Sequence, residues 1–138
     1  MKEIKVRAWD KKLNIMWESI EFTKLLRYLF FESFPNATAY GEIKGHFDDI
    51  IWLEYTGLKD KKGVDIYEGD IVQLDKESRP MFVEYQSPSF VMKWKTKKGY
   101  ISKQWSEFQL YYKENQFYTI IGNIYANPEL IGDKKWNI

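Results

Sequence analysis

The chain has 138 residues and a net charge of +1, from 21 basic and 20 acidic side chains. This length fits one domain or two small subdomains that share a core, and the balanced charge excludes a basic arm or acidic tail that binds by gross electrostatics. The absence of cysteine excludes disulfides and thiolate metal sites and fits a reducing cytosol. Since no apolar run reaches the roughly 20 residues that span a bilayer, we expect a soluble protein without a membrane partner.

The N-terminal part of the chain predicts a hairpin and a helix. Apolar and polar residues alternate over residues 3–9 and again over 13–17, with a turn at 10–12 between them, which is the pattern of a β-hairpin. Leu and Phe recur at helical spacing over residues 23–34, and Pro35 follows. We expect one short helix there, with a strand as the alternative because the segment is rich in aromatic residues.

From residue 50 onward the chain predicts a series of short strands. An apolar run at 50–55 indicates a buried strand, and the residues at 102–112 fit either a short helix or a strand. Alternating patterns separated by Gly and Pro turns predict further strands at 72–75, 81–85, 90–95 and 117–125. Aromatic residues make up 18% of the chain, which favours sheet and leaves rings for the surface or a subunit interface. This spacing suggests a small barrel or sandwich.

Residues 55–72, with the sequence YTGLKDKKGVDIYEGDIV, hold several turn signals directly before a strand. A polar turn at 60–63 ends in Gly63, which is free to take a positive φ. A second turn at 68–70 leads into the strand, and the side chain of Asp70 can accept hydrogen bonds from nearby backbone amides. A Gly-Asp turn followed by an alternating strand also occurs at the start of small SH3-like barrels.

Together with RAWDKK at 7–12 and IIGNIYANPEL at 120–130, this segment resembles the YopX family of phage and prophage proteins. The resemblance implies a compact, β-rich protein that is carried by bacteriophages or prophages. Members of the family commonly have no assigned activity, so the resemblance supplies no catalytic residues. Where the family often has Glu in its NIYENPEL block, this chain has Ala126. We expect Asn127 to cap a short helical turn, Pro128 to open that turn, and Leu130 to fold back onto the core.

The predicted fold class is mainly β, or α+β by content. We expect a small SH3-like β-barrel in the C-terminal subdomain, residues 55–138. It packs with an N-terminal subdomain, residues 1–54, that consists of the β-hairpin and one short helix.

Candidate catalytic groups are few. His46 is the one histidine of the chain, and it precedes Asp48 and Asp49 in a cluster that could in principle bind a divalent metal. Adjacent carboxylates point in different directions, however, so we expect a solvated loop and no metal or cofactor. We expect no Ser/His/Asp set around this single histidine, and the absence of cysteine excludes a Cys nucleophile. No Gly-rich phosphate loop is present. We therefore expect no enzymatic activity and no small-molecule substrate.

One segment, KWKTKKGYISKQW at 93–105, combines five lysines and three aromatic residues with no acidic residue. Lysines and aromatic rings on a hairpin suit phosphate neutralisation and base stacking, and the lack of arginine favours non-specific contact. The candidate binding residues are Lys93, Lys95, Lys97, Lys98, Tyr100, Lys103 and Trp105. The alternative is an exposed hairpin whose lysines prevent aggregation through an edge strand, with Trp94 and Trp105 in the core.

The sequence predicts a phage accessory protein that acts as a non-catalytic protein-interaction module. Its partner would be a host or phage protein, or a second copy of the chain in a homo-oligomer, in the cytoplasm of the infected bacterial host. The alternative function is a nucleic-acid-binding barrel that uses the hairpin at 93–105.

Overall fold

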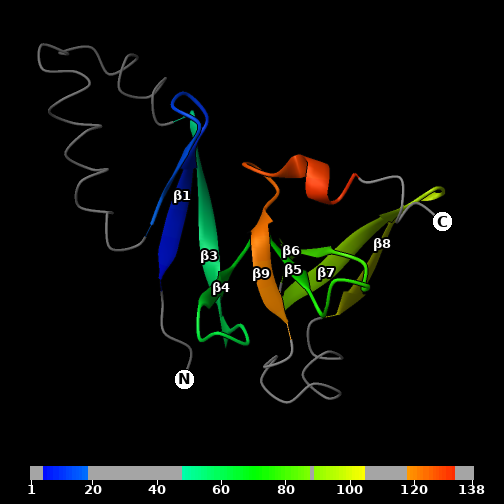
Figure 1. Cartoon of the computed structure of the whole chain (residues 1–138). Coiled ribbons are helices and arrows are strands. Elements are labelled where there is room, and N and C mark those ends of the chain that lie inside the picture. Colours follow the sequence, from blue (N-terminus) through cyan, green and yellow to red (C-terminus); the bar gives the residue numbers. More distant parts are fainter. Residues whose placement is uncertain (1–4, 19–47, 88, 105–117, 133–138) are drawn as a thin grey trace, which may run out of the picture. The chain divides into compact units, whose positions relative to one another are not determined.

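The computed structural model describes residues 5–18, 48–87, 89–104 and 118–132 (Figure 1). The chain forms two compact units, one of Lys5–Glu54 and one of Tyr55–Ile138 together with Met1–Ile4. The predicted helix at 23–34, His46 and Trp105 lie outside the described residues. Within the described ranges, no helix has the length and apolarity that a membrane span requires.

The unit Lys5–Glu54 contains the predicted N-terminal hairpin. Strand β1 (Val6–Asp10) pairs antiparallel with β2 (Ile15–Trp17) on one side and with the first half of β3 (Ile50–Lys59) on the other. The hairpin is confirmed, but its turn begins one residue later than predicted because Asp10 is the last residue of β1. The buried Asp10 carboxylate accepts the backbone N–H groups of Lys12 and Leu13 and the indole N–H of Trp17.

Strand β3 differs from the prediction in length and in burial. It extends to Lys59. The predicted buried strand at 50–55 is only partly buried: Ile50, Leu53 and Tyr55 are buried, whereas Trp52 and Glu54 are exposed to solvent. The second half of β3 belongs to the other unit, where it pairs with β4 (Asp65–Tyr67).

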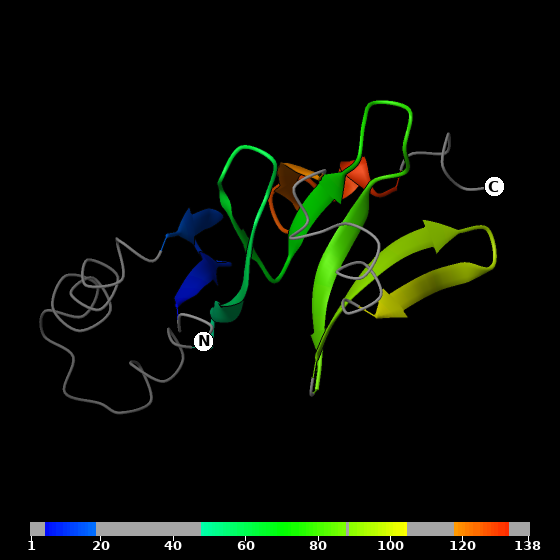
Figure 2. The same ribbon diagram turned by 90° about the horizontal axis from the view of Figure 1, so that it is seen from below.

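The unit that begins at Tyr55 is built on a five-stranded antiparallel sheet with the order β8-β7-β6-β5-β9. Its strands are β5 (Asp70–Gln73), β6 (Met81–Gln86), β7 (Ser89–Thr96), β8 (Gly99–Gln104) and β9 (Thr119–Asn123). Figure 2 shows β7 and β8, in yellow-green, as a hairpin with its turn at the far end from β6. The ambiguous segment at 102–112 is thus strand as far as Gln104, and the rest of it lies outside the described residues.

The core of this unit lies on one face of the sheet. Its buried members are Ile66, Val72, Val83, Phe90, Met92 and Tyr118. Val83 and Met92 are opposite each other in the β6–β7 register, so their side chains share this face. Full burial of such a side chain contributes about 1.5–3 kcal/mol. Ile71 and Phe82 are also buried, although alternation directs them to the other face. Both faces at the centre of the sheet are therefore covered.

The predicted turns are largely confirmed. Gly63 and Gly69 have φ values of 82° and 89°, a region that costs residues with a Cβ about 1–2 kcal/mol. Asp70 Oδ2 accepts the backbone N–H of Tyr67 at 2.8 Å and holds the second turn closed, as expected.

The prediction for the NPEL block is wrong in two details. Pro128 begins the 3-10 helix η4 (Pro128–Leu130), but the side chain of Asn127 makes no capping hydrogen bond. Its Oδ1 accepts the backbone N–H of Asn123 instead, because the chain reverses and brings that amide within 3.2 Å. Leu130 is only partly buried, since η4 contains no buried residue.

The predicted mainly β fold class, with curled antiparallel sheets, is confirmed. Its SH3-like character stays a prediction.

Candidate functional site

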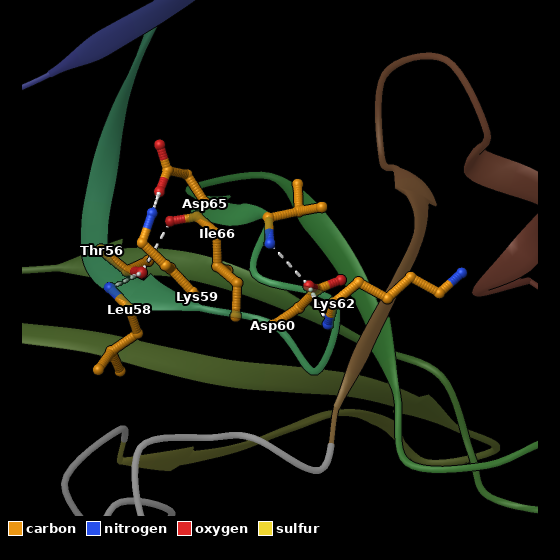
Figure 3. A network of polar contacts seen from close by, with 8 residues as sticks. Thr56, Leu58, Lys59, Asp60, Lys62, Asp65 and Ile66 are labelled. Atoms are coloured by element: carbon orange, nitrogen blue, oxygen red, sulfur yellow. Dashed lines mark hydrogen bonds and ion pairs between the residues drawn. The ribbon is translucent and has the colours of Figure 1, made fainter.

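The two buried acids of the 55–72 segment, Asp60 and Asp70, accept backbone hydrogen bonds. Asp60 is buried, and its Oδ1 accepts the N–H groups of Lys62 and Val64 at 2.8 and 2.9 Å (Figure 3). Its Oδ2 accepts the N–H of Ile120 at 3.1 Å, 60 residues further along the chain. Because both oxygens hold amides in place, this carboxylate is a structural acceptor. With Asp70 in the same role, neither acid is placed as a general base.

Other polar contacts of this segment are also structural. Thr56 Oγ1 donates to the carbonyl of Ile66 at 2.7 Å and accepts the N–H of Leu58 at 3.2 Å (Figure 3). Lys59 Nζ pairs with Asp65 at 2.6 Å. A search of the described ranges finds no group of three metal-ligating side chains.

The β7–β8 hairpin, residues 89–104, has a different chemistry, and we call it the lysine hairpin. It holds five lysines and no acidic residue. Lys97 and Lys98 form the turn between the strands, followed by Gly99 with a φ of 118°. This is the turn that the sequence predicts, and glycine is preferred at this position of a tight turn.

The strand register divides the predicted site residues between two faces. Lys93 is opposite Ser102 and Lys95 is opposite Tyr100, so these lysines and the Tyr100 ring share one face. Lys103 is opposite Met92 and therefore lies on the other face, which also carries Trp94. The structure thus brings together Lys93, Lys95 and Tyr100 and separates them from Lys103.

Lys93 is held by an ion pair and two aromatic rings. Its Nζ lies 3.0 Å from Glu84 Oε2, 5.3 Å from the ring centroid of Tyr100 and 5.9 Å from that of Phe82. The two rings contact each other edge to face, with centroids 5.9 Å apart. These contacts are cation–π and aromatic interactions that fix the lysine in place.

The carboxylate of Glu84 is kept ionised in this arrangement. Burial acts to raise its pKa, but hydrogen bonds from the side chains of Gln86 and Lys93, together with the charge of Lys93, outweigh burial and lower the pKa. Sequence reasoning missed Glu84 and Phe82 because the β6–β7 register alone brings them beside Lys93.

Three other lysines of the hairpin extend into solvent. Lys95, Lys97 and Lys98 are exposed, and no carboxylate in the described part of the chain forms an ion pair with them. The turn is closed by a neutral side chain, since Thr96 Oγ1 donates to the carbonyl of Gly99 and accepts the N–H of Lys98. The result is a tip with concentrated positive charge beside the exposed ring of Tyr100.

Comparisons with known proteins identify a family and a fold. The family model described as YopX protein matches residues 5–132. A crystal structure of protein EF1440 from Enterococcus faecalis is similar, with a TM-score of 0.59 and 22% sequence identity, over 95% of this chain and 99% of that chain. A search of curated proteins gives no match. The resemblance seen in the sequence is confirmed, and the structural match shows the fold alone.

Proposed function

The chain belongs to the YopX family, and we propose that it is a non-catalytic protein-interaction module that binds an acidic protein surface through the lysine hairpin. The partner would be a host or phage protein in the cytoplasm of a bacterium that carries the phage. The proposal rests on three exposed positive charges within four residues, none of which forms an ion pair with a described carboxylate. These charges belong to Lys95, Lys97 and Lys98. Such a patch favours encounter with an acidic surface and fixes its orientation.

The absence of catalysis is part of the proposal. Two carboxylates of residues 55–72, Asp60 and Asp70, are both buried and accept hydrogen bonds from backbone N–H groups. A carboxylate in this role stabilises a turn and is not available to take a proton from a substrate.

A protein partner suits the lysine hairpin better than nucleic acid does. The Tyr100 ring already contacts Lys93 and Phe82, which leaves less of it for base stacking. The five lysines of the hairpin are the observation that keeps nucleic acid as the second candidate.

Capture from host lysate with paired charge-reversal variants tests the proposal. The test variant is Lys95→Glu with Lys97→Glu. Its control is Lys61→Glu with Lys62→Glu, since these lysines are also exposed and also precede a glycine of positive φ in a tight turn. We expect the wild type and the control to retain the same acidic protein, and the test variant to lose it by about tenfold or more.

The partner should dissociate as salt is raised, because exposed charges are screened over about 10 Å at 0.1 M salt. Equal capture by the test variant and the control would contradict the proposal. Capture that nuclease abolishes, together with salt-dependent binding of purified DNA, would instead favour the nucleic-acid function.

A further inference from the structure

The two edges of the five-stranded sheet differ in how their backbone is satisfied. At the β9 edge, the N–H of Ile120 donates to Asp60 and the carbonyl of Tyr118 accepts the N–H of Lys61, so the turn at 60–63 covers that edge. At the opposite edge, β8 pairs with β7 and with no other strand of the described chain. An edge strand of this kind presents backbone donors and acceptors to an additional strand.

The register indicates which residues of β8 present these groups. Thr96 and Gly99 are partners on either side of a two-residue loop, where the first residue accepts a hydrogen bond from the fourth. Hydrogen-bonded and non-hydrogen-bonded pairs then alternate along an antiparallel ladder. The Lys95–Tyr100 and Lys93–Ser102 pairs are therefore non-hydrogen-bonded. The N–H and C=O groups of Tyr100 and Ser102 consequently point away from β7.

The side chains along this edge suit a peptide strand. Tyr100 is 56% exposed on one face of β8 and Ile101 is 46% exposed on the other, so an added strand would cover apolar surface on both sides. Lys93 and Lys95 do not protect the edge, because they are on β7, one strand in from it. Lys103 is the one lysine on β8, and it lies on the opposite face. The charge of these lysines selects an acidic occupant.

We propose that β8 binds an extended acidic protein segment by strand addition, with backbone hydrogen bonds to Tyr100 and Ser102 and ion pairs to the exposed lysines. This inference rests on the proposed function, and it specifies the form of the partner: a segment that can become a strand, in which acidic residues face the side of the sheet that carries Lys95. Strand addition of this kind draws affinity from the main chain and specificity from alternate side chains.

A proline substitution at an outward-facing amide tests this inference. Ser102→Pro removes the N–H that an added strand would use, while Ser102→Ala keeps it. Proline is tolerated on an edge strand where the N–H faces solvent, so the hairpin should stay intact. The probe is a short fluorescent peptide in which Glu and Val alternate, studied at low salt by titration and by amide hydrogen exchange of the full chain.

We expect the peptide to slow exchange at the amides of Tyr100 and Ser102, while those of Ile101 and Lys103 are protected with or without it. Ser102→Pro should weaken binding by about tenfold, and Ser102→Ala by less than about threefold. The spectrum of each variant without peptide shows whether the hairpin is folded. If Ser102→Pro is unfolded, the exchange pattern of Ser102→Ala decides alone.

Three results separate this inference from the function on which it rests. Loss of binding in the Lys95→Glu, Lys97→Glu variant with no effect of Ser102→Pro would overturn strand addition and leave the acidic partner in place. Failure of both substitutions to alter binding, or no binding of the peptide by the wild type, would overturn strand addition and count against the acidic partner. Binding of a thymidine oligonucleotide without protection at Tyr100 and Ser102 would overturn it in favour of nucleic acid.

Discussion

Replacing Asp60 with alanine removes the acceptor of three backbone N–H groups at once. The amides of Lys62 and Val64 belong to exposed residues of the turn, so water can partly replace the carboxylate there. The amide of Ile120 lies in β9 and loses its hydrogen-bond acceptor, the carboxylate of Asp60, which is 60 residues earlier in the chain. An unsatisfied amide costs about 1–3 kcal/mol. We take about 1 kcal/mol for each turn amide and about 1–2 for Ile120, which gives a loss of about 3–4 kcal/mol in the free energy of unfolding.

Urea unfolding followed by circular dichroism at neutral pH measures this loss, with Asp75→Ala as the control. Asp75 accepts hydrogen bonds from the N–H of Glu77 and the hydroxyl of Ser78 in a similar turn, but it is exposed and both of these partners lie within three residues of it. Its replacement should cost about 1 kcal/mol or less. Amide exchange at Ile120 should become faster in Asp60→Ala and stay unchanged in Asp75→Ala.

The conservative change Asp60→Asn tests whether both oxygens of the carboxylate are needed as hydrogen-bond acceptors. An amide keeps one oxygen for the two turn N–H groups but turns an NH₂ group towards the N–H of Ile120, or the reverse. We expect an intermediate loss of stability. If Asp60→Ala costs no more than Asp75→Ala, then the link between the turn and β9 is not a stabilising one, and the argument that this turn closes the β9 edge fails.

Two further predictions follow from the turn glycines and from Glu84. Gly69→Ala should destabilise the unit by about 1–2 kcal/mol because Gly69 has a φ of 89°. The control is Gly132→Ala, whose added Cβ meets nothing closer than 3.8 Å and which should change the free energy of unfolding by no more than about 0.5 kcal/mol. Equal effects of the two substitutions in urea unfolding would refute the backbone argument. Since Gln86 and Lys93 lower the folded pKa of Glu84 despite its burial, its contribution to stability is present above the unfolded pKa of about 4.3 and is lost as pH falls through the folded value. The stability difference between wild type and Glu84→Gln should therefore shrink below that pH, and a difference that grows on acidification would contradict the assignment.

Alternation and turn chemistry were sufficient to predict most strands of the second unit. The patterns at 81–85 and 90–95 correspond to β6 and β7, and the lysine turn is where the sequence places it. These features are local, because the period of two and the turn residues are set within a few positions. Alternation does not show which face is buried, and here both Val83 and Phe82 are.

The contacts that define the candidate site depend on distant residues and could not be predicted in the same way. Asp60 is recognisable as a turn residue, but its bond to Ile120 crosses 60 positions. Glu84 neutralises Lys93 only because the β6–β7 register sets the two residues on one face. The side chain of Asn127 can either cap η4 or accept the backbone N–H of Asn123. The path of the backbone determines which of these two hydrogen bonds forms.

The two Lys-Lys-Gly turns of this unit show how the same local sequence leads to different surfaces. Asp60 closes the first turn with a carboxylate, which also accepts a hydrogen bond at the edge of β9. Thr96 closes the second turn with a hydroxyl. A hydroxyl can satisfy a turn amide but adds no negative charge. The first turn therefore covers one edge of the sheet, whereas the second contains no carboxylate and lies beside the other edge, which is where a partner strand can add.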